Sequence, residues 1–101
     1  MIWIIYGPPG CGKTRMARRL AGSRDVMFDL DLIAESMGLP NARPPVEYCK
    51  LQMLLAMREG FIGALEKHGS GDCNVYIIVS NRDSATTIAR RLKAQMVTVD
   101  H

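Results

Sequence analysis

The residues whose types and spacing could carry chemistry lie between Gly7 and Thr14, where the sequence reads Gly-Pro-Pro-Gly-Cys-Gly-Lys-Thr and fits the pattern G-x-x-x-x-G-K-[ST]. Phosphate oxygens must be met by several backbone N–H groups at once, so the chain has to wrap closely around them. Glycine permits that approach and the positive φ angles it requires. A helix that begins directly after the loop adds unpaired N–H groups and the positive end of its dipole. The pattern therefore predicts a binding site for a nucleoside triphosphate.

Each position of this phosphate loop has a predicted role. Lys13 reaches the β- and γ-phosphates, and the Thr14 hydroxyl is a magnesium ligand. Cys11 stands at a variable position, where a small filling side chain is a better interpretation than a redox switch. The alternative, a Gly/Pro-rich turn with an incidental lysine, is weakened by the flanking elements. The predicted ATP-binding residues are Gly7, Pro8, Pro9, Gly10, Cys11, Gly12, Lys13 and Thr14.

The elements that must position the loop lie on both sides of it. Residues 1–6 are apolar at every position, which is typical of a strand buried on both faces of a parallel sheet. Residues 13–21 have a helical apolar pattern that ends at Gly22. A short second strand over residues 25–31 runs into acidic residues, and Asp31 can cap a brief helix over residues 32–37.

The remaining chain continues the alternation of strands and helices. After a proline-rich loop, residues 46–67 predict one long helix with a possible bend at its glycines, in which Met53 and Met57 fill the core. A β-branched run over residues 74–80 predicts a third strand. A helix capped by Asp83 or Ser84 then runs through Ala94, and a fourth strand covers residues 96–100.

The predicted order β-α-β-α-α-β-α-β indicates an α/β domain over residues 1–101, with a mostly parallel sheet of about four strands and helices on both faces. Ligands in such sheets bind beyond the carboxyl ends of the strands. We therefore expect the phosphate loop, Asp29 and Asp31, and Ser80 and Asn81 to surround one crevice.

Phosphoryl transfer needs a carboxylate near the metal and a group that orients the nucleophile. Asp31 stands at the exit of the second strand and is the preferred candidate to orient or deprotonate an acceptor hydroxyl, so the predicted catalytic residues are Lys13 and Asp31. Thr14 and Asp29 are the predicted metal ligands. The alternative is that Asp31 only caps a helix and Asp29 is solvated.

Four stretches together resemble P-loop kinases: the phosphate loop, Phe28-Asp29-Leu30-Asp31, Ile77-Ile78-Val79-Ser80-Asn81-Arg82-Asp83 and Val97-Thr98-Val99-Asp100. The chain is most similar to small AAA-type ATP-binding proteins of phages and bacteria that are related to polynucleotide and zeta-toxin kinases. The resemblance implies the three-layer sandwich of P-loop NTPases, with ATP and Mg²⁺ as cofactors. It also implies that Asp31 contacts the acceptor hydroxyl and that Ser80 and Asn81 match the T-N of a D-x-T-N motif.

The sequence departs from this family in two places. Ile78 stands where the family has the aspartate that partners magnesium through water, so Asp29 or Asp31 must supply the carboxylate, or catalysis is weak. The family's arginine-bearing lid and fifth strand do not follow the last predicted strand, which is expected of a fragment or of a short form completed by a partner. Arg43, Arg58 and Arg82 remain as candidates for clamping the transferring phosphate, with a surface or interface role as the alternative.

Composition sets the remaining expectations. The three cysteines have no C-x-x-C spacing, and the net charge is +3. We see no signal peptide and no apolar run long enough to span a bilayer. These features and the unpaired cysteines favour a cytoplasmic protein, located in the cytoplasm of the host cell if the protein is viral. His68 and His101 have no companions at ligand spacing. Basic residues of the first and last helices suit a nucleic-acid partner, with two solvated helix faces as the alternative.

Two hypotheses result. The chain is a kinase that transfers the γ-phosphate of ATP to a hydroxyl of a nucleoside, a nucleotide or a polynucleotide end, or it is an ATPase or nucleotide-binding module completed by a partner or by oligomerisation. A GTPase is not supported, because D-x-x-G and N-K-x-D motifs are both missing. A nucleic-acid-binding protein without nucleotide chemistry would rest only on the basic residues.

Overall fold

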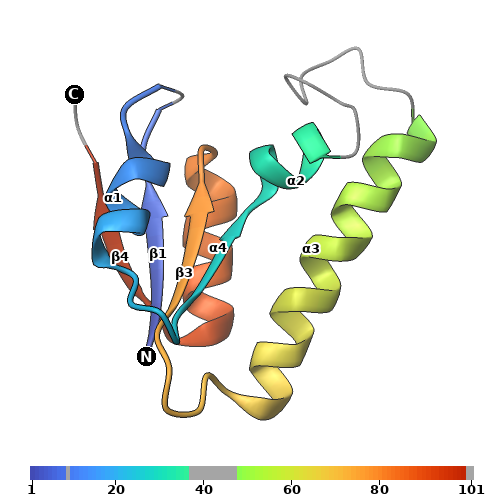
Figure 1. The fold of residues 1–101 in the computed structure, drawn as a ribbon. Helices are drawn as coiled ribbons and strands as arrows, with labels where there is room; N and C mark the ends of the chain where they lie inside the picture. Colours follow the sequence, from blue (N-terminus) through green and yellow to red (C-terminus); the bar gives the residue numbers. More distant parts are fainter. Residues whose placement is uncertain (9, 37–47, 100–101) are drawn as a thin grey trace.

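The computed structural model describes residues 1–8, 10–36 and 48–99, and their strands form one parallel sheet (Figure 1). The sheet has four strands in the order β2-β3-β1-β4 within these residues. Along the chain the elements are β1 (Ile2–Tyr6), α1 (Lys13–Leu20), β2 (Val26–Asp29), α2 (Leu30–Ser36), α3 (Tyr48–His68), β3 (Val75–Val79), α4 (Arg82–Leu92) and β4 (Gln95–Thr98). The predicted α/β class, element order and parallel sheet are confirmed.

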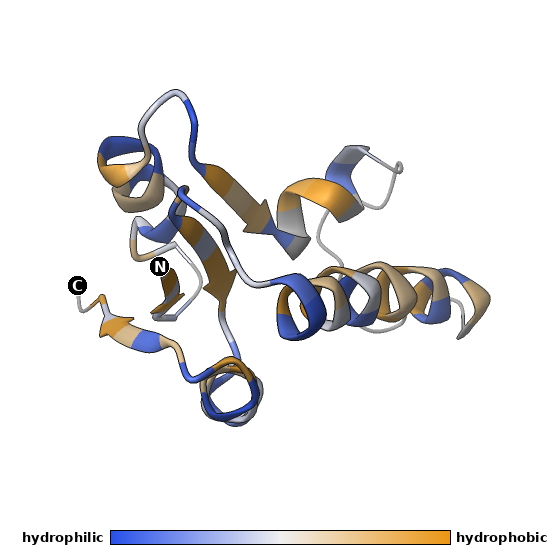
Figure 2. Cartoon of the chain, turned by 90° about the horizontal axis from the view of Figure 1, so that it is seen from below, coloured by the Kyte–Doolittle hydropathy of each residue, from blue (hydrophilic) through white to orange (hydrophobic). Residues whose placement is uncertain are grey.

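Helices cover both faces of the sheet because the central strands are apolar on both faces. Successive side chains of a strand point to opposite faces. Ile4 and Ile77 accordingly join a core cluster with Ile62 of α3 and Ile88 of α4, whereas Ile5 joins a second cluster with residues of α1 and β3. Figure 2 shows the hydrophobic strands between α1 on one side and α3 and α4 on the other.

An ion-pair network on the outer surface connects α3 and α4. Arg91 donates to Glu59 at 2.9 Å and to Glu66 at 2.6 Å. The hydrogen bond from Arg91 lowers the pKa of the Glu66 carboxyl. These charges are exposed to solvent, so the network aligns the two helices more than it stabilises the fold.

The long helix differs from its sequence-based prediction in which side chains it buries. Leu54 and Ile62 are buried, but Met53 is 51% exposed and Met57 is 39% exposed, so the prediction that these methionines fill the core was wrong. The reason is the face of α3 on which they lie, because residues four apart share one face of a helix and the neighbouring Leu54 lies on another (Figure 1). Within the described residues no helix has the length and apolarity to cross a membrane.

Candidate functional site

The loop between β1 and α1 takes its shape from two glycines. Gly10 and Gly12 have φ angles of 79° and 93°, in the left-handed region that favours glycine. Between them the Cys11 N–H donates to the Pro8 carbonyl at 3.3 Å, which closes a turn. Pro9 lies outside the described residues. The glycines at positions 10 and 12 are thus explained by the positive φ angles that the backbone adopts there.

Gly7 is required because another segment crosses next to it. A Cβ atom at this position would lie 2.6 Å from the Cys11 Sγ and 2.6 Å from the Val99 carbonyl oxygen. Val99 is held there by its N–H, which donates to the Tyr6 carbonyl at 2.7 Å. The Cys11 thiol is buried in this contact, consistent with its predicted role as a small filling side chain.

Lys13, the first residue of α1, lies against the loop instead of extending into solvent. It is only 6% exposed, and its Nζ donates to the Pro8 carbonyl at 2.9 Å. Gly12 precedes it as the N-cap residue, with no side-chain cap, and the first turn of α1 contains no acidic residue. The positive helix end and the lysine charge therefore combine on one side of the loop.

Thr14 connects this loop to the second strand. Its Oγ1 donates to Asp29 Oδ2 at 2.6 Å, and Asp29, the last residue of β2, is 6% exposed. A hydroxyl and a carboxylate at this separation are hard oxygen donors of the kind that Mg²⁺ prefers. No group of three or more His, Cys, Asp or Glu residues within the described chain could hold a metal by itself. A site with one carboxylate suits Mg²⁺, which usually takes its other ligands from water and substrate phosphates.

Asp29 also organises the start of α2. Its Oδ1 accepts from the Leu32 N–H at 3.4 Å, and α2 begins at Leu30. The prediction that Asp31 caps this helix was therefore wrong: Asp29 is the capping residue, because the strand ends two residues earlier than expected. Asp31 lies within the first turn of α2, and its side chain lies outside the described part of the chain.

The carboxyl ends of β1 and β3 form a topological switch point. These strands are neighbours, but α1 follows β1 on one face of the sheet and α4 follows β3 on the other. Crevices at such points are the usual ligand sites of open α/β sheets. The loop between β1 and α1 follows β1, and the Ser80–Asn81 segment follows β3, so both segments lie at this edge of the sheet.

The prediction that Asp83 or Ser84 caps α4 was also wrong. Asn81 is the N-cap residue, and its Oδ1 accepts from the Ser84 N–H at 2.9 Å, so α4 begins before Asp83. The asparagine three residues before a serine was the sequence signal for this cap. On β3, Ile78 is buried and pairs in register with Asp29, so the carboxylate near Thr14 comes from β2 and not from β3.

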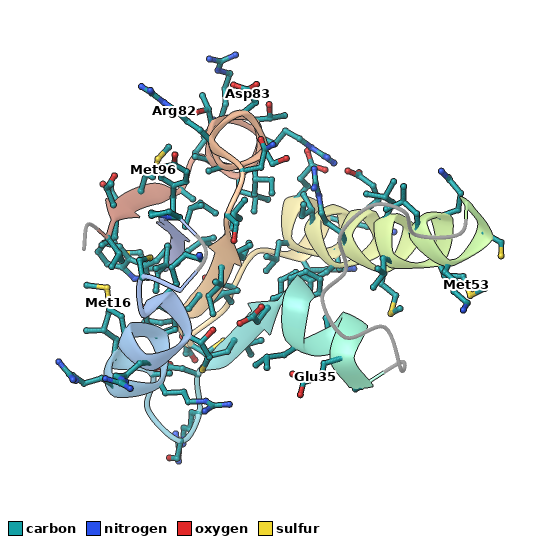
Figure 3. All side chains as sticks on the ribbon, turned by 90° about the horizontal axis from the view of Figure 1, so that it is seen from above. Met16, Glu35, Met53, Arg82, Asp83 and Met96 are labelled. Carbon is teal, nitrogen blue, oxygen red and sulfur yellow. The ribbon has the colours of Figure 1, made fainter. Side chains whose placement is uncertain are left out.

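The three arginines proposed as phosphate clamps have different positions. Arg82 is exposed at the start of α4, where Figure 3 shows it at the outer surface. Arg43 lies outside the described residues. Arg58, in α3, lines a pocket beside the carboxyl end of β3. Sequence analysis missed this pocket, although an arginine at an apolar position of the helical pattern was the available signal.

Comparisons with known proteins gave no match to a family model, to a curated protein or to a solved structure.

Proposed function

We propose that this chain is an ATP-binding protein with the P-loop NTPase fold, and that it transfers the γ-phosphate of ATP to a hydroxyl of a nucleoside, a nucleotide or a polynucleotide end. The observation that carries the proposal is the 2.6 Å contact between Thr14 and Asp29, beside the buried Lys13 and the glycine-shaped loop. These are the parts that binding of a magnesium triphosphate needs: a backbone cradle, a cation, a hydroxyl and a carboxylate.

The loop residues bind and orient the triphosphate. Backbone N–H groups of Gly12, Lys13 and Thr14 donate to the phosphate oxygens, and the Lys13 ammonium moves from the Pro8 carbonyl to the β- and γ-phosphates. Thr14 and Asp29 would hold Mg²⁺, which would neutralise charge on the phosphates. The chain's contribution is to hold the γ-phosphorus in a fixed position for in-line attack.

Asp31 is the proposed acceptor base. Asp29 is already committed to Thr14 and to the Leu32 N–H, which leaves Asp31 as the next carboxylate along the chain. Its carboxylate takes the proton of the acceptor hydroxyl while the hydroxyl oxygen bonds to the γ-phosphorus and the bond to the ADP oxygen breaks. This role follows from the position of Asp31 two residues after the last residue of β2.

A second candidate is an ATPase or nucleotide-binding module without a specific acceptor. It is favoured by Ile78, an apolar residue at the position on β3 where a metal-partnering carboxylate was expected. In this case a partner protein or another copy of the chain supplies the missing parts.

The test incubates the protein with γ-labelled ATP, Mg²⁺ and a panel of nucleosides, nucleotides and 5′-hydroxyl oligonucleotides. Label is expected on one class of acceptor. The Asp31→Asn variant is expected to lose transfer by at least two orders of magnitude, as removal of a general base does, while its ATP affinity stays unchanged. Lys13→Ala is expected to lose ATP binding. ATP turnover that does not change with any acceptor would support the second candidate. Failure to bind ATP would exclude both candidate functions.

A further inference from the structure

The segment that forms α1 carries an unbalanced positive charge. Residues 13–24 contain five of the 13 basic residues of the chain and none of its ten acidic residues. The rest of the chain has eight basic and ten acidic residues, so the positive net charge comes from this one segment. Lys13 is buried, whereas the other basic residues of the segment are exposed: Arg15, Arg18, Arg19 and Arg24.

Three of these arginines share one face of α1, and we call Arg15, Arg18 and Arg19 the α1 arginine patch. They are three and four positions apart, and residues at that spacing are neighbours on a helix surface, with Cβ atoms about 5–6 Å apart. Ala17 is fully buried and lies on the opposite side of the helix, where α1 packs on the sheet. Because α3 and α4 cover the other face of the sheet, the patch is turned away from both of them (Figure 2).

The charge of the patch is not neutralised within the described part of the chain. The ion pairs between described residues are those of Arg91 on α4, which binds Glu59 and Glu66 of α3. Asp25 is the acidic residue nearest to the patch in sequence, and its two oxygens accept from backbone N–H groups instead. The basic residues of the first and last helices, which look alike in the sequence, therefore differ: glutamates pair with the last helix and leave α1 positive.

The stability of α1 does not explain all three arginines. Arg18 and Arg19 lie in its last turn, where a positive charge interacts favourably with the helix dipole. Arg15 lies in the first turn, which has no acidic residue and where a positive charge is unfavourable. Like charges at this spacing also repel one another. A ligand with several negative charges would relieve this repulsion.

The absence of aromatic side chains from the patch favours one class of polyanion. Proteins that bind single strands stack the bases on exposed aromatic residues, and protein interfaces also rely on aromatic anchors. The aromatic residues whose burial the structure describes are all buried or half-buried: Trp3, Tyr6, Phe28, Phe61 and Tyr76. The apolar side of α1 packs on the sheet, so it is not free to insert into a membrane. A surface of arginines suits a nucleic-acid duplex, which has one negative charge per about 1.7 Å of its axis.

We propose that the α1 arginine patch binds the phosphate backbone of double-stranded nucleic acid without reading its sequence. Arginine recognises phosphate through paired N–H groups, and contacts to the backbone carry no direct sequence information. The inference goes beyond the proposed function and does not need ATP. Lys13, the cation of the phosphate loop, is buried and lies outside the patch.

The test measures binding of a fluorescently labelled DNA duplex of about 20 base pairs to the full chain by anisotropy, without ATP. Each neutralised phosphate contributes about −0.9 to the slope of log K against log[salt]. Three contacts therefore predict a slope of about −2.7, which is a roughly 40-fold loss of affinity between about 20 and 80 mM salt. The triple variant Arg15→Gln, Arg18→Gln, Arg19→Gln is expected to lose this salt dependence and to bind at least tenfold more weakly at the lower salt concentration. Duplexes of different sequence should bind the wild type equally.

The matched control removes the same charge at exposed positions of α3 and α4 and directly after α4: Lys67→Gln, Arg90→Gln and Lys93→Gln. This second triple variant should keep the wild-type slope. Equal losses in the two triple variants would show that only net charge matters and would overturn the inference. Glutamine is a good helix former, so α1 is expected to persist. If the α1 variant nevertheless does not fold, Arg15→Gln alone decides, since its slope should be less steep by about 0.9 and an unchanged slope would overturn the inference.

Other probes test the choice of partner. A single strand of the same length is expected to bind more weakly than the duplex. Tighter binding of the single strand, of polyglutamate or of vesicles that contain phosphatidylserine would overturn the assignment to a duplex.

The Lys13→Ala variant separates this inference from the proposed function. It is expected to lose ATP and to bind the duplex like the wild type. Patch-dependent duplex binding by a wild-type protein that does not bind ATP would support the inference and refute the proposed function. ATP binding without patch-dependent duplex binding would refute the inference and leave the proposed function standing.

Discussion

The Thr14 hydroxyl donates to the Asp29 carboxylate at 2.6 Å and so joins the first turn of α1 to the end of β2. A hydroxyl bound to a carboxylate at this distance makes a charge-assisted hydrogen bond, about twice as strong as a neutral one. Because Asp29 also accepts from the start of α2, one buried carboxylate orients two helices and one strand end. The two oxygens proposed to hold Mg²⁺ are therefore fixed relative to each other by the fold.

The first prediction concerns this contact. Thr14→Val keeps the size of the side chain and removes its hydroxyl, and Thr14→Ser keeps the hydroxyl. We expect Thr14→Val to weaken magnesium-dependent ATP binding by about 10- to 100-fold, since a hydrogen bond to a charged group contributes roughly 1.5–3 kcal/mol and each 1.4 kcal/mol is tenfold. Titration with ATP, with and without Mg²⁺, measures this loss, which should vanish without the metal.

The matched control is Thr87→Val, at an exposed position of α4. It should bind magnesium and ATP like the wild-type protein. An unchanged metal dependence in Thr14→Val, or an equal loss in Thr14→Ser, would contradict the assignment of the Thr14 hydroxyl.

The second prediction tests the close approach at Gly7. A Cβ atom there would lie 2.6 Å from both the Cys11 Sγ and the Val99 carbonyl oxygen, and the latter is backbone that cannot turn aside. Gly7→Ala is therefore expected to lower the free energy of unfolding by about 1–3 kcal/mol, the usual cost of overpacking. Chemical denaturation measures the change.

Gly60 is the matched glycine for this test. It lies inside α3, and nothing would come within 4 Å of its added Cβ. Gly60→Ala is expected to raise the free energy of unfolding by about 0.5–1 kcal/mol, because alanine is the better helix former. Equal effects at the two glycines would show that Gly7 is not under steric constraint.

The sequence predicted the architecture well because its signals were local. β1 and β3 are buried on both faces and are uniformly apolar, and the phosphate loop has the glycines that its φ angles require. Order and type of the elements followed from these patterns. The strand order and the switch point needed the structure, because they depend on which strands pair across long separations.

Two features of the site could not be predicted, for physical reasons. Thr14 and Asp29 were predicted as a pair, but the end of β2 at Asp29 and its role as the cap of α2 were not, because element boundaries are poorly determined by sequence. Arg58 stands at an apolar position of the helical pattern, but the burial of its Nε results from how α3 packs over the sheet, which the sequence alone does not give. The exposure of Met53 likewise depends on which face of α3 packs inward, since the adjacent Leu54 is buried.

The third prediction concerns the packing of α3 over the sheet. Ile62 of α3 is fully buried in the cluster that includes Ile4 and Ile88. Ile62→Ala is expected to lower the free energy of unfolding by about 2–5 kcal/mol, from lost burial and from the cavity left behind. Met53→Ala, at the exposed end of α3 (Figure 3), should change it by less than about 0.5 kcal/mol. Similar losses at both positions would mean that the Met53 side chain is covered as well as the Ile62 side chain.

The last prediction is a pH dependence that centres on Asp25. Its two carboxylate oxygens accept from different N–H groups: Oδ2 from Gly22 at 2.7 Å and Oδ1 from Asn74 at 2.9 Å. These bonds, with the one from Gly22 as the larger cause, lower the pKa of Asp25 in the folded protein. A lowered pKa means that the folded state favours the charged carboxylate. The Asp25 charge therefore contributes to the stability of the fold at pH values above the unfolded pKa of about 3.9. It is lost as the pH falls through the lower, folded pKa.

Asp25→Asn has a single side-chain oxygen and can satisfy only one of the two N–H groups. We therefore expect the variant to unfold at a lower temperature than the wild type at pH 7, and the difference to shrink as the pH falls below about 4, where the unfolded wild-type chain takes up a proton at Asp25 before the folded protein does. Thermal unfolding between pH 2.5 and pH 7 measures both curves. Asp72→Asn, an exposed aspartate between α3 and β3, is the control and should leave a pH profile parallel to that of the wild type. A constant difference between wild type and Asp25→Asn across this range would show that the charge of Asp25 contributes nothing, because only an ionised group can give a stability that depends on pH.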